Sequence, residues 1–134
     1  MASTMNEPAI RMHGIHKSFG ANEVLRGIDL AAQRGETLSI IGPSGSGKST
    51  LARHFNALLL PTEGRCTVAG LDTKETQELW RIRQLVSMVF QNPDNQFFTL
   101  DVLSDLVFGC ENFGIAKAEI ARKPDYVVNL LKIK

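Results

Sequence analysis

The residues with the clearest chemical purpose form a glycine-rich block that ends in a lysine and a serine. The block, Gly42-Pro43-Ser44-Gly45-Ser46-Gly47-Lys48-Ser49, fits the pattern G-x-x-x-x-G-K-[ST] at every fixed position. Glycines permit backbone conformations that turn successive N–H groups inward around a phosphate. Lysine adds a mobile positive charge, and a serine hydroxyl can ligate Mg²⁺. The block therefore predicts a loop that holds the phosphates of a nucleotide.

Several residues of this loop have an expected role. Lys48 can reach the β- and γ-phosphates, Ser49 can ligate Mg²⁺, and Thr50 can contact the α-phosphate. At average residue frequencies, the motif arises by chance in roughly one chain of this length in a few hundred. The predicted nucleotide-binding residues are Gly42, Ser44, Gly45, Ser46, Gly47, Lys48, Ser49 and Thr50.

The segments around the loop have the pattern required to position it. Residues 37–41 are a short apolar run that ends at Gly42, as a buried strand of an α/β sheet does. Beyond Lys48 the apolar residues recur at helical spacing, and Pro61 marks the end of that helix. A loop followed by a helix receives the positive N-terminal end of the helix, which favours a bound phosphate. This context lowers the odds of a chance match further.

The rest of the chain alternates strand and helix patterns. Strands are expected at residues 9–12, 24–30, 65–69 and 86–90, and turns or polar loops at 33–36 and 91–96. Helices are expected over residues 75–84, after an N-cap at Asp101, and from near Ala116, where Pro124 disturbs the pattern. The helix after Asp101 places Leu103, Leu106, Val107 and Cys110 on one face. These patterns predict an α/β domain with a β-rich N-terminal portion.

Composition excludes several classes of function. The 134 residues are 43% apolar and 22% charged with a net charge of +1, so there is no basic field for a nucleic-acid partner. No apolar run is long enough to span a bilayer, and the polar N-terminus is not a signal peptide. The two cysteines, Cys66 and Cys110, are expected to be reduced thiols. Any link to a membrane must run through a partner.

Three blocks around the loop resemble ABC-transporter ATPases. They are Gly14-Ile15-His16-Lys17-Ser18-Phe19-Gly20, Leu25-Arg26-Gly27-Ile28-Asp29-Leu30 with Arg34-Gly35-Glu36, and the phosphate loop continued through Thr50-Leu51. In that family an aromatic residue upstream of the loop stacks on the adenine of ATP, and Phe19 stands at the matching place. The alternative for Phe19 is ordinary core packing.

A later block narrows the resemblance to one branch of the family. Val86-Ser87-Met88-Val89-Phe90-Gln91-Asn92-Pro93-Asp94-Asn95-Gln96 is similar to the Q-loop of energy-coupling-factor and cobalt-type importer ATPases. In that family the glutamine that matches Gln91 approaches the Mg²⁺ and the attacking water, and its loop touches the membrane partner. The resemblance thus assigns Gln91 catalytic and metal-contacting roles, with a strand cap as the alternative. The first third of the chain also suits an amino-acid importer ATPase.

The sequence lacks the later motifs of this family. No Leu-Ser-Gly-Gly-Gln signature, no Walker B strand with its catalytic glutamate and no switch histidine can be found. Phe97-Phe98-Thr99-Leu100-Asp101 imitates a strand that ends in Asp, but it falls where the family has a helix N-terminus. We therefore interpret residues 1–134 as a truncated ABC-type nucleotide-binding domain: a P-loop NTPase core, a β-rich subdomain and the start of a helical subdomain. Such a chain is expected to bind ATP without turnover.

The resemblance implies a function for the full-length family member. It implies an importer ATPase on the cytoplasmic face of the cell membrane, which moves a vitamin or a cobalt or nickel ion through membrane subunits. It also implies a second ATPase domain, arranged head to tail with the first. The alternatives are an amino-acid-type importer ATPase and a non-catalytic nucleotide-binding fragment. A P-loop kinase fits less well, because about forty residues of β-rich sequence precede this loop.

Three other features invite a functional interpretation that the pattern does not support. His13 and His16 form an H-x-x-H pair without the further ligands that a structural zinc needs. Trp80 is expected to pack half-buried on its helix. His54 is expected to be a partly exposed surface residue.

Overall fold

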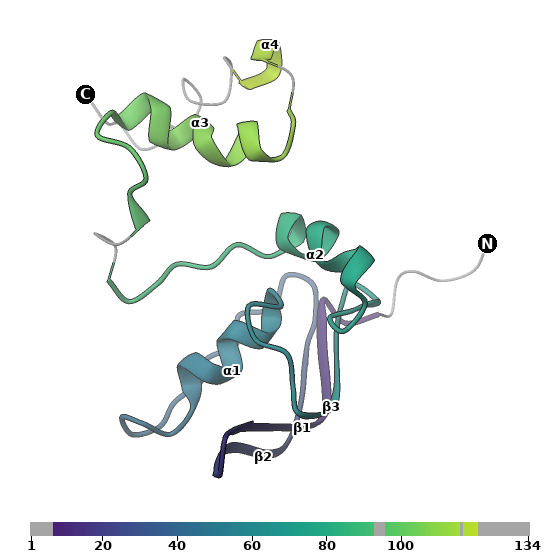
Figure 1. The fold of residues 1–134 in the computed structure, drawn as a ribbon. Helices are drawn as coiled ribbons and strands as arrows, with labels where there is room; N and C mark the ends of the chain where they lie inside the picture. Colours follow the sequence, from purple (N-terminus) through teal and green to yellow (C-terminus); the bar gives the residue numbers. More distant parts are fainter. Residues whose placement is uncertain (1–6, 93–95, 116, 121–134) are drawn as a thin grey trace, which may run out of the picture. The chain divides into compact units, whose positions relative to one another are not determined.

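The computed structural model describes residues 7–92, 96–115 and 117–120. The chain forms two compact units, Met1–Met88 and Val89–Lys134. The first unit contains a four-stranded antiparallel sheet with the order β2-β1-β3-β4 (Figure 1). The strands are β1 (Ile10–Phe19), β2 (Asn22–Ala32), β3 (Glu63–Val68) and β4 (Leu71–Asp72).

The strands β1 and β2 form a hairpin because a two-residue turn joins them, and their pairing shifts register between Met12 and Ser18. Phe19 pairs with Asn22 across that turn, and Gly20 adopts a left-handed φ of 60° there. One face of the sheet is buried, and its core consists of Met12, Ile15, Leu25, Leu51 and Cys66. The strands predicted at residues 9–12, 24–30 and 65–69 are confirmed, although β1 runs seven residues further than predicted, to Phe19.

Helix α1 (Lys48–Phe55) packs Leu51 into this core. It ends well before the predicted stop at Pro61, because the chain turns at Asn56 and Ala57. Ala57 adopts a left-handed φ of 55°, and the Asn56 side chain accepts a hydrogen bond from the Leu58 amide at 3.2 Å. A short 3₁₀ turn, η1 (Thr76–Glu78), and helix α2 (Leu79–Leu85) confirm the helix predicted at residues 75–84. Ile82 of α2 is fully buried against Ala57 and Val68.

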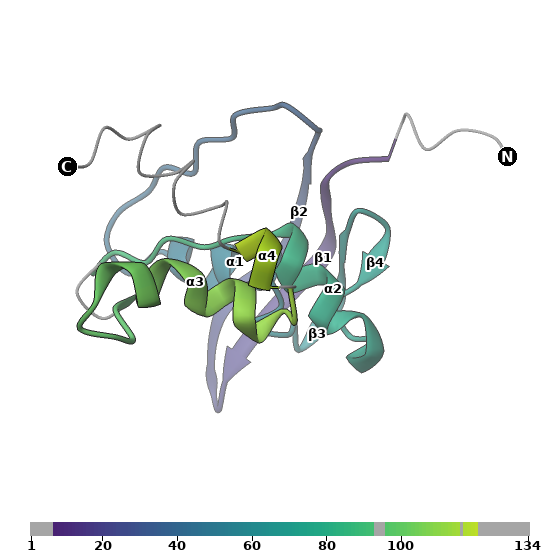
Figure 2. The ribbon, with the colours of Figure 1, turned by 90° about the horizontal axis from the view of Figure 1, so that it is seen from above.

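Two predicted core strands are not formed, and both predictions were wrong. Residues 37–41 and 86–90 carry no strand assignment, and Ile41 and Val89 are 93% and 86% exposed. Figure 2 shows that residues 33–47 leave β2 as a long connection without helix or strand. A buried strand of a parallel sheet needs hydrogen-bonding neighbours. No strand among residues 7–92, 96–115 and 117–120 pairs with either segment.

The second unit contains α3 (Val102–Asn112) and the short α4 (Lys117–Ile120). The prediction of Asp101 as N-cap is confirmed, because its carboxylate accepts the Ser104 amide at 2.8 Å. The Phe98 and Phe108 rings stack with their centroids 4.6 Å apart. Pro124, predicted to disturb the last helix, lies outside the described residues.

Within the part of the chain that the structure describes, every helix is too short or too polar to traverse a lipid bilayer.

Candidate nucleotide-binding site

The predicted phosphate loop leads directly into helix α1, as the motif requires. Gly47 is the N-cap residue of α1 with a left-handed φ of 92°, and no side chain caps the helix there. The first intrahelical hydrogen bond runs from the Leu51 amide to the Gly47 carbonyl at 2.8 Å. The amides of the first turn therefore lack intrahelical acceptors and can donate to an anion. The first turn holds no acidic residue that would compete with a phosphate.

The lysine of the loop is folded back onto the loop itself. Lys48 Nζ donates to the carbonyl oxygens of Gly42, at 2.9 Å, and Pro43, at 2.7 Å. The Ser46 amide also donates to the Pro43 carbonyl at 3.3 Å. The first two residues of the loop are thus hydrogen-bonded to its second half. An ammonium group placed this way can exchange neutral carbonyl acceptors for charged phosphate oxygens, which form stronger hydrogen bonds.

Two loop glycines meet different spatial requirements. A Cβ at Gly42 would stand 2.8 Å from the Ser46 hydroxyl, so the loop folds tightly at this point. Gly45 has a left-handed φ of 80° and no atom within 4 Å of the position where a Cβ would be. That open space lies on the loop, where a phosphate must approach the backbone closely.

The remaining loop residues present hydroxyl groups at the surface. Ser44, Ser46 and Ser49 are exposed, and Thr50 is partly buried. The Ser49 hydroxyl makes no hydrogen bond to any residue in the described ranges, so its oxygen is available as a ligand. Mg²⁺ prefers oxygen ligands, and this position in the first turn of α1 fits it.

Phe19, predicted to stack on adenine, stands at the end of β1 with 49% of its side chain exposed. Core packing was the alternative, and this degree of exposure favours a residue with a free surface. Lys17 Nζ lies 5.2 Å from the centroid of the Phe19 ring. Sequence reasoning missed Lys17, although a basic residue two positions from an aromatic one on a strand shares its face.

The structure brings β2, the hairpin partner of the strand that carries Phe19, close to the end of the phosphate loop. A Cβ at Gly47 would stand 3.1 Å from Leu25 and 3.2 Å from Val24, both in β2. Leu25 is the Cα partner of Lys17 in the β1–β2 hairpin. The predicted base contact and the predicted phosphate contacts therefore share one region of the first unit.

Gln91 is the one predicted site residue that belongs to the second unit. It is exposed and follows the unpaired segment 86–90, so it does not cap a strand. The Gln96 side-chain amide donates to the Phe90 carbonyl at 3.3 Å, which closes the base of the loop that contains Gln91. Residues 93–95 of that loop lie outside the described residues.

The prediction that His54 is a partly exposed surface residue was wrong. Its side chain is fully buried, and Nδ1 hydrogen-bonds to the Thr50 carbonyl at 2.7 Å. Within the described residues, Nε2 has no hydrogen-bond partner. Burial lowers the pKa of His54, so the imidazole is neutral near pH 7. The Cys66 thiol of β3 lies 3.6 Å from the backbone carbonyl oxygen of His54.

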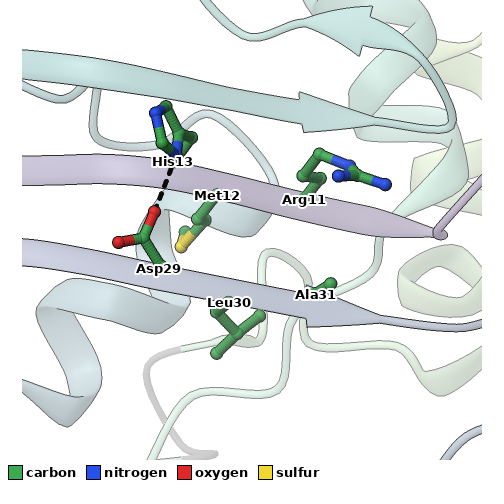
Figure 3. Close-up of a pocket in the computed structure, with 6 residues that line it drawn as sticks. All are labelled: Arg11, Met12, His13, Asp29, Leu30 and Ala31. Atoms are coloured by element: carbon green, nitrogen blue, oxygen red, sulfur yellow. Dashed lines mark hydrogen bonds and ion pairs between the residues drawn. The ribbon is translucent and has the colours of Figure 1, made fainter.

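A separate hollow of about 430 Å³ lies on the β1–β2 hairpin and contains none of the predicted site residues (Figure 3). His13 Nδ1 lies 2.8 Å from the Asp29 carboxylate, which also accepts the Gly14 amide at 3.0 Å. The Gly14 amide, and to a smaller degree His13, holds the pKa of Asp29 below its usual value. His16 Nδ1 similarly lies 2.7 Å from a Glu23 carboxylate oxygen. Each histidine of the H-x-x-H pair thus has its own carboxylate.

A glycine-rich loop that leads into an uncapped helix, with a lysine bonded back to the loop, is the loop–helix part of the architecture of the P-loop nucleotide-binding proteins. The sequence profile of the ABC transporter family matches residues 25–133, and the chain belongs to that family. The matched span contains the loop and Gln91, whereas Phe19 precedes it.

Two similar curated proteins are ATP-binding proteins of energy-coupling factor transporters. The chain is 51% identical over 125 residues to the energy-coupling factor transporter ATP-binding protein EcfA1 of Symbiobacterium thermophilum, covering 87% of this chain and 44% of that protein. It is 44% identical over 119 residues to the EcfA1 protein of Bacillus subtilis, covering 89% of this chain and 42% of that protein. The chain thus spans less than half the length of these relatives.

A solved structure agrees in fold. The chain matches cbiO1 from Clostridium perfringens, described as part of the ABC transporter complex cbiONQ, with a TM-score of 0.79 and 29% identity. The match covers 92% of this chain and 50% of that chain. The predicted fold class, an ABC ATPase fold with a β-rich N-terminal subdomain, is confirmed, as is the resemblance to the energy-coupling-factor branch.

Proposed function

We propose that this chain is the ATP-binding part of an ABC importer ATPase. The observation that carries the proposal is the intact phosphate loop, which leads into an uncapped helix α1 within a span that matches the ABC transporter family. The domain proposal is that residues 1–134 are the P-loop and Q-loop portion of a longer nucleotide-binding domain. The relatives, of which this chain spans 44% or less, are consistent with that proposal.

The phosphate chain of ATP would lie against the loop and the first turn of α1. The β-phosphate would lie in the open space at Gly45 and accept hydrogen bonds from the backbone amides of the first turn of α1, which follows Gly47. Lys48 would leave the Gly42 and Pro43 carbonyls and donate to the β- and γ-phosphates. Ser44 and Ser46 would contribute loop amides or hydroxyls, and Thr50 would contact the α-phosphate.

The Ser49 hydroxyl and the Gln91 amide oxygen would hold Mg²⁺, whose bound form neutralises charge on the phosphates. Gln91 would also orient the attacking water, since an amide both donates and accepts hydrogen bonds. Phe19 would stack on the adenine, which is typically worth about 1–3 kcal/mol for one aromatic–base contact.

In the full-length protein this part would serve transport. The names of the relatives, an energy-coupling factor transporter and the cbiONQ complex, support membrane transport subunits as partners. We propose a vitamin or a cobalt or nickel ion as the transported substrate, and a second ATPase domain bound head to tail. The ATPase would lie on the inner face of the cell membrane, attached through its partner subunits.

Binding is tested by replacing the lysine of the loop. Lys48→Ala removes the mobile phosphate charge and is expected to weaken binding of Mg²⁺–ATP by about tenfold or more. Isothermal titration of ATP with Mg²⁺ into both forms measures the effect. Lys74→Ala is a matched control, because Lys74 is an exposed lysine that also donates to a backbone carbonyl, that of Gly64 at 3.0 Å. Equal affinities of wild type and Lys48→Ala for Mg²⁺–ATP would contradict the proposed function.

Hydrolysis is tested separately. A chain of these 134 residues contains no residue that matches the catalytic glutamate, the signature or the switch histidine of the family. Gln91 is too weak a base to activate water by itself. We therefore propose binding without turnover for this chain alone. A phosphate-release rate on the order of one per second, lost in Lys48→Ala, would mean that another residue here supplies the base.

A further inference from the structure

The ring of Phe19 is held on one side by a lysine with no assigned role. Lys17 Nζ lies over the Phe19 ring, 5.2 Å from its centroid, and donates a hydrogen bond to the Leu60 carbonyl at 2.9 Å. The two residues are neighbours on one side of β1, since side chains two positions apart on a strand share a face. About half of the Phe19 side chain, 49%, remains exposed. The Phe19 ring therefore contacts the Lys17 ammonium group, and its exposed part is accessible to a ligand.

The segment whose Leu60 carbonyl accepts the hydrogen bond from Lys17 makes two more hydrogen bonds to β1. We name residues 56–62, which join α1 to β3, the strap. The Thr62 amide donates to the His16 carbonyl at 2.9 Å, and the Ser18 amide donates to the Thr62 hydroxyl at 3.0 Å. With the bond from Lys17 to Leu60, three consecutive residues of β1 are bonded to the strap. The strand end that carries Phe19 is thereby fixed to it.

The other end of the strap is fixed to the helix that follows the phosphate loop. The Leu59 amide donates to the Arg53 carbonyl in α1 at 3.0 Å, and the Leu58 amide donates to the Asn56 side chain at 3.2 Å. Ala57, in its left-handed conformation, is 4% exposed and packs in a second hydrophobic cluster with Val68 and Ile82. A hydrogen-bonded path thus runs from the phosphate loop through α1 and the strap to the strand end at Phe19.

We propose that Lys17 is a positioning residue for the nucleobase, which acts through Phe19, and that the strap fixes the distance between base and phosphate contacts. A cation over one face of an aromatic ring restrains the ring and leaves the opposite face for stacking. A ring that is already ordered loses less freedom when a base binds, and this preorganisation strengthens binding. The proposal rests on the proposed function, because it requires ATP at the loop.

The test separates the base from the phosphates. Titration calorimetry measures the dissociation constants of two ligands, Mg²⁺–ATP and Mg²⁺–tripolyphosphate, the second of which has no base. The proteins compared are wild type, Lys17→Met, Lys17→Arg, Phe19→Ala and the double variant Lys17→Met/Phe19→Ala. Lys17→Met keeps the aliphatic stem and is expected to weaken ATP binding roughly two- to fivefold, with tripolyphosphate binding unchanged. Lys17→Arg is expected to restore ATP affinity. In the Phe19→Ala background, the Lys17→Met change should have no further effect.

Two more variants keep the test decisive. Lys74→Met removes another lysine bonded to a backbone carbonyl and should leave both affinities unchanged. Thr62→Val removes the acceptor of the Ser18 amide with little change of shape, and should weaken ATP binding about twofold without affecting tripolyphosphate. If Lys17→Met is poorly folded, Thr62→Val and Lys17→Arg decide the outcome.

Some results would overturn the proposal while the proposed function stands. One is that Lys17→Met weakens the binding of ATP and of tripolyphosphate by the same factor. Another is that Lys17→Met weakens ATP binding as much in the Phe19→Ala background as in wild type. The third is unchanged ATP affinity in both Lys17→Met and Thr62→Val. If wild type binds neither compound in a Lys48-dependent manner, the proposed function fails first, and the role of Lys17 falls with it.

Discussion

The paired strands β1–β3 and the unpaired segments 37–41 and 86–90 are similar in sequence and opposite in structure. Ile15 and Cys66, in paired strands, are 0% exposed. Ile41 and Val89, in segments at least as apolar, are 93% and 86% exposed. An apolar run is therefore insufficient for a strand, because buried backbone groups also need hydrogen-bonding partners.

The difference lies in how far along the chain a partner must be found. β1 and β2 are separated by a two-residue turn, so each supplies the partner of the other. Strands of a parallel sheet need a crossover connection and neighbours that lie far apart in sequence. No such neighbour is present within residues 7–92, 96–115 and 117–120. The phosphate loop is thus anchored mainly on its helix side, where Gly47 lies against β2.

The largest expected contrast concerns two glycines with similar backbones. Gly64 in β3 has a φ of 86° and Gly45 in the exposed loop has a φ of 80°. A Cβ at Gly64 would overlap the Gly14 carbonyl of β1, whereas one at Gly45 meets no atom within 4 Å. Gly64→Ala is expected to reduce the free energy of unfolding by about 4 kcal/mol or more, and Gly45→Ala by about 1 kcal/mol. Urea denaturation followed by circular dichroism measures both, and similar losses would contradict the contrast.

A smaller contrast uses two isoleucines. Ile15→Ala opens a cavity in the first core and is expected to cost about 3 kcal/mol of unfolding free energy. Ile41→Ala removes an exposed side chain and is expected to change it by less than about 0.5 kcal/mol. The same denaturation experiment measures the two values. A cost at Ile41 close to that at Ile15 would mean that residues 37–41 are buried after all.

The pH dependence of stability reports on the buried face of α1. Burial lowers the pKa of His54 from its usual 6.5, so the unfolded chain binds a proton more readily than the folded one. The stability from the neutral imidazole is complete above pH 6.5 and is lost as the pH falls below it. His54→Phe is expected to reduce the loss of unfolding free energy between pH 7 and pH 5. An identical pH profile in the variant would place His54 in solvent.

The smallest expected effect is one of reactivity. Burial raises the pKa of the Cys66 thiol to about 11, while Cys110 in α3 is only partly buried. Because the thiolate is the reactive form, a disulfide reagent at pH 8 should modify Cys110 about tenfold faster or more than Cys66. Cys110→Ser should abolish the fast phase, and Cys66→Ser should leave it unchanged. Two thiols reacting at one rate in the folded chain would argue against a closed core at β3.

Local patterns were sufficient for the junction between the glycine-rich loop and helix α1, and for parts of the elements whose partners lie nearby. The start of α1 after Gly47, the strand segments 9–12 and 24–30 and the Asp101 cap each depend on a few adjacent residues, and the sequence predicted them. The family resemblance identified the Phe19 and Gln91 positions, whose roles stay predictions. Periodicity also predicted which face of α1 is apolar, through Leu51 and Phe55.

Only the tertiary structure decided which apolar segments are buried and which side chains support the site. The exposure of residues 37–41, the burial of His54 and the contact of Lys17 with Leu60 each depend on segments far apart in sequence. A helical wheel shows where His54 lies on α1, but only the packing of the folded chain determines whether water reaches its side chain. The physical reason is that burial and hydrogen-bond pairing are properties of neighbours in space, which a local sequence pattern does not contain.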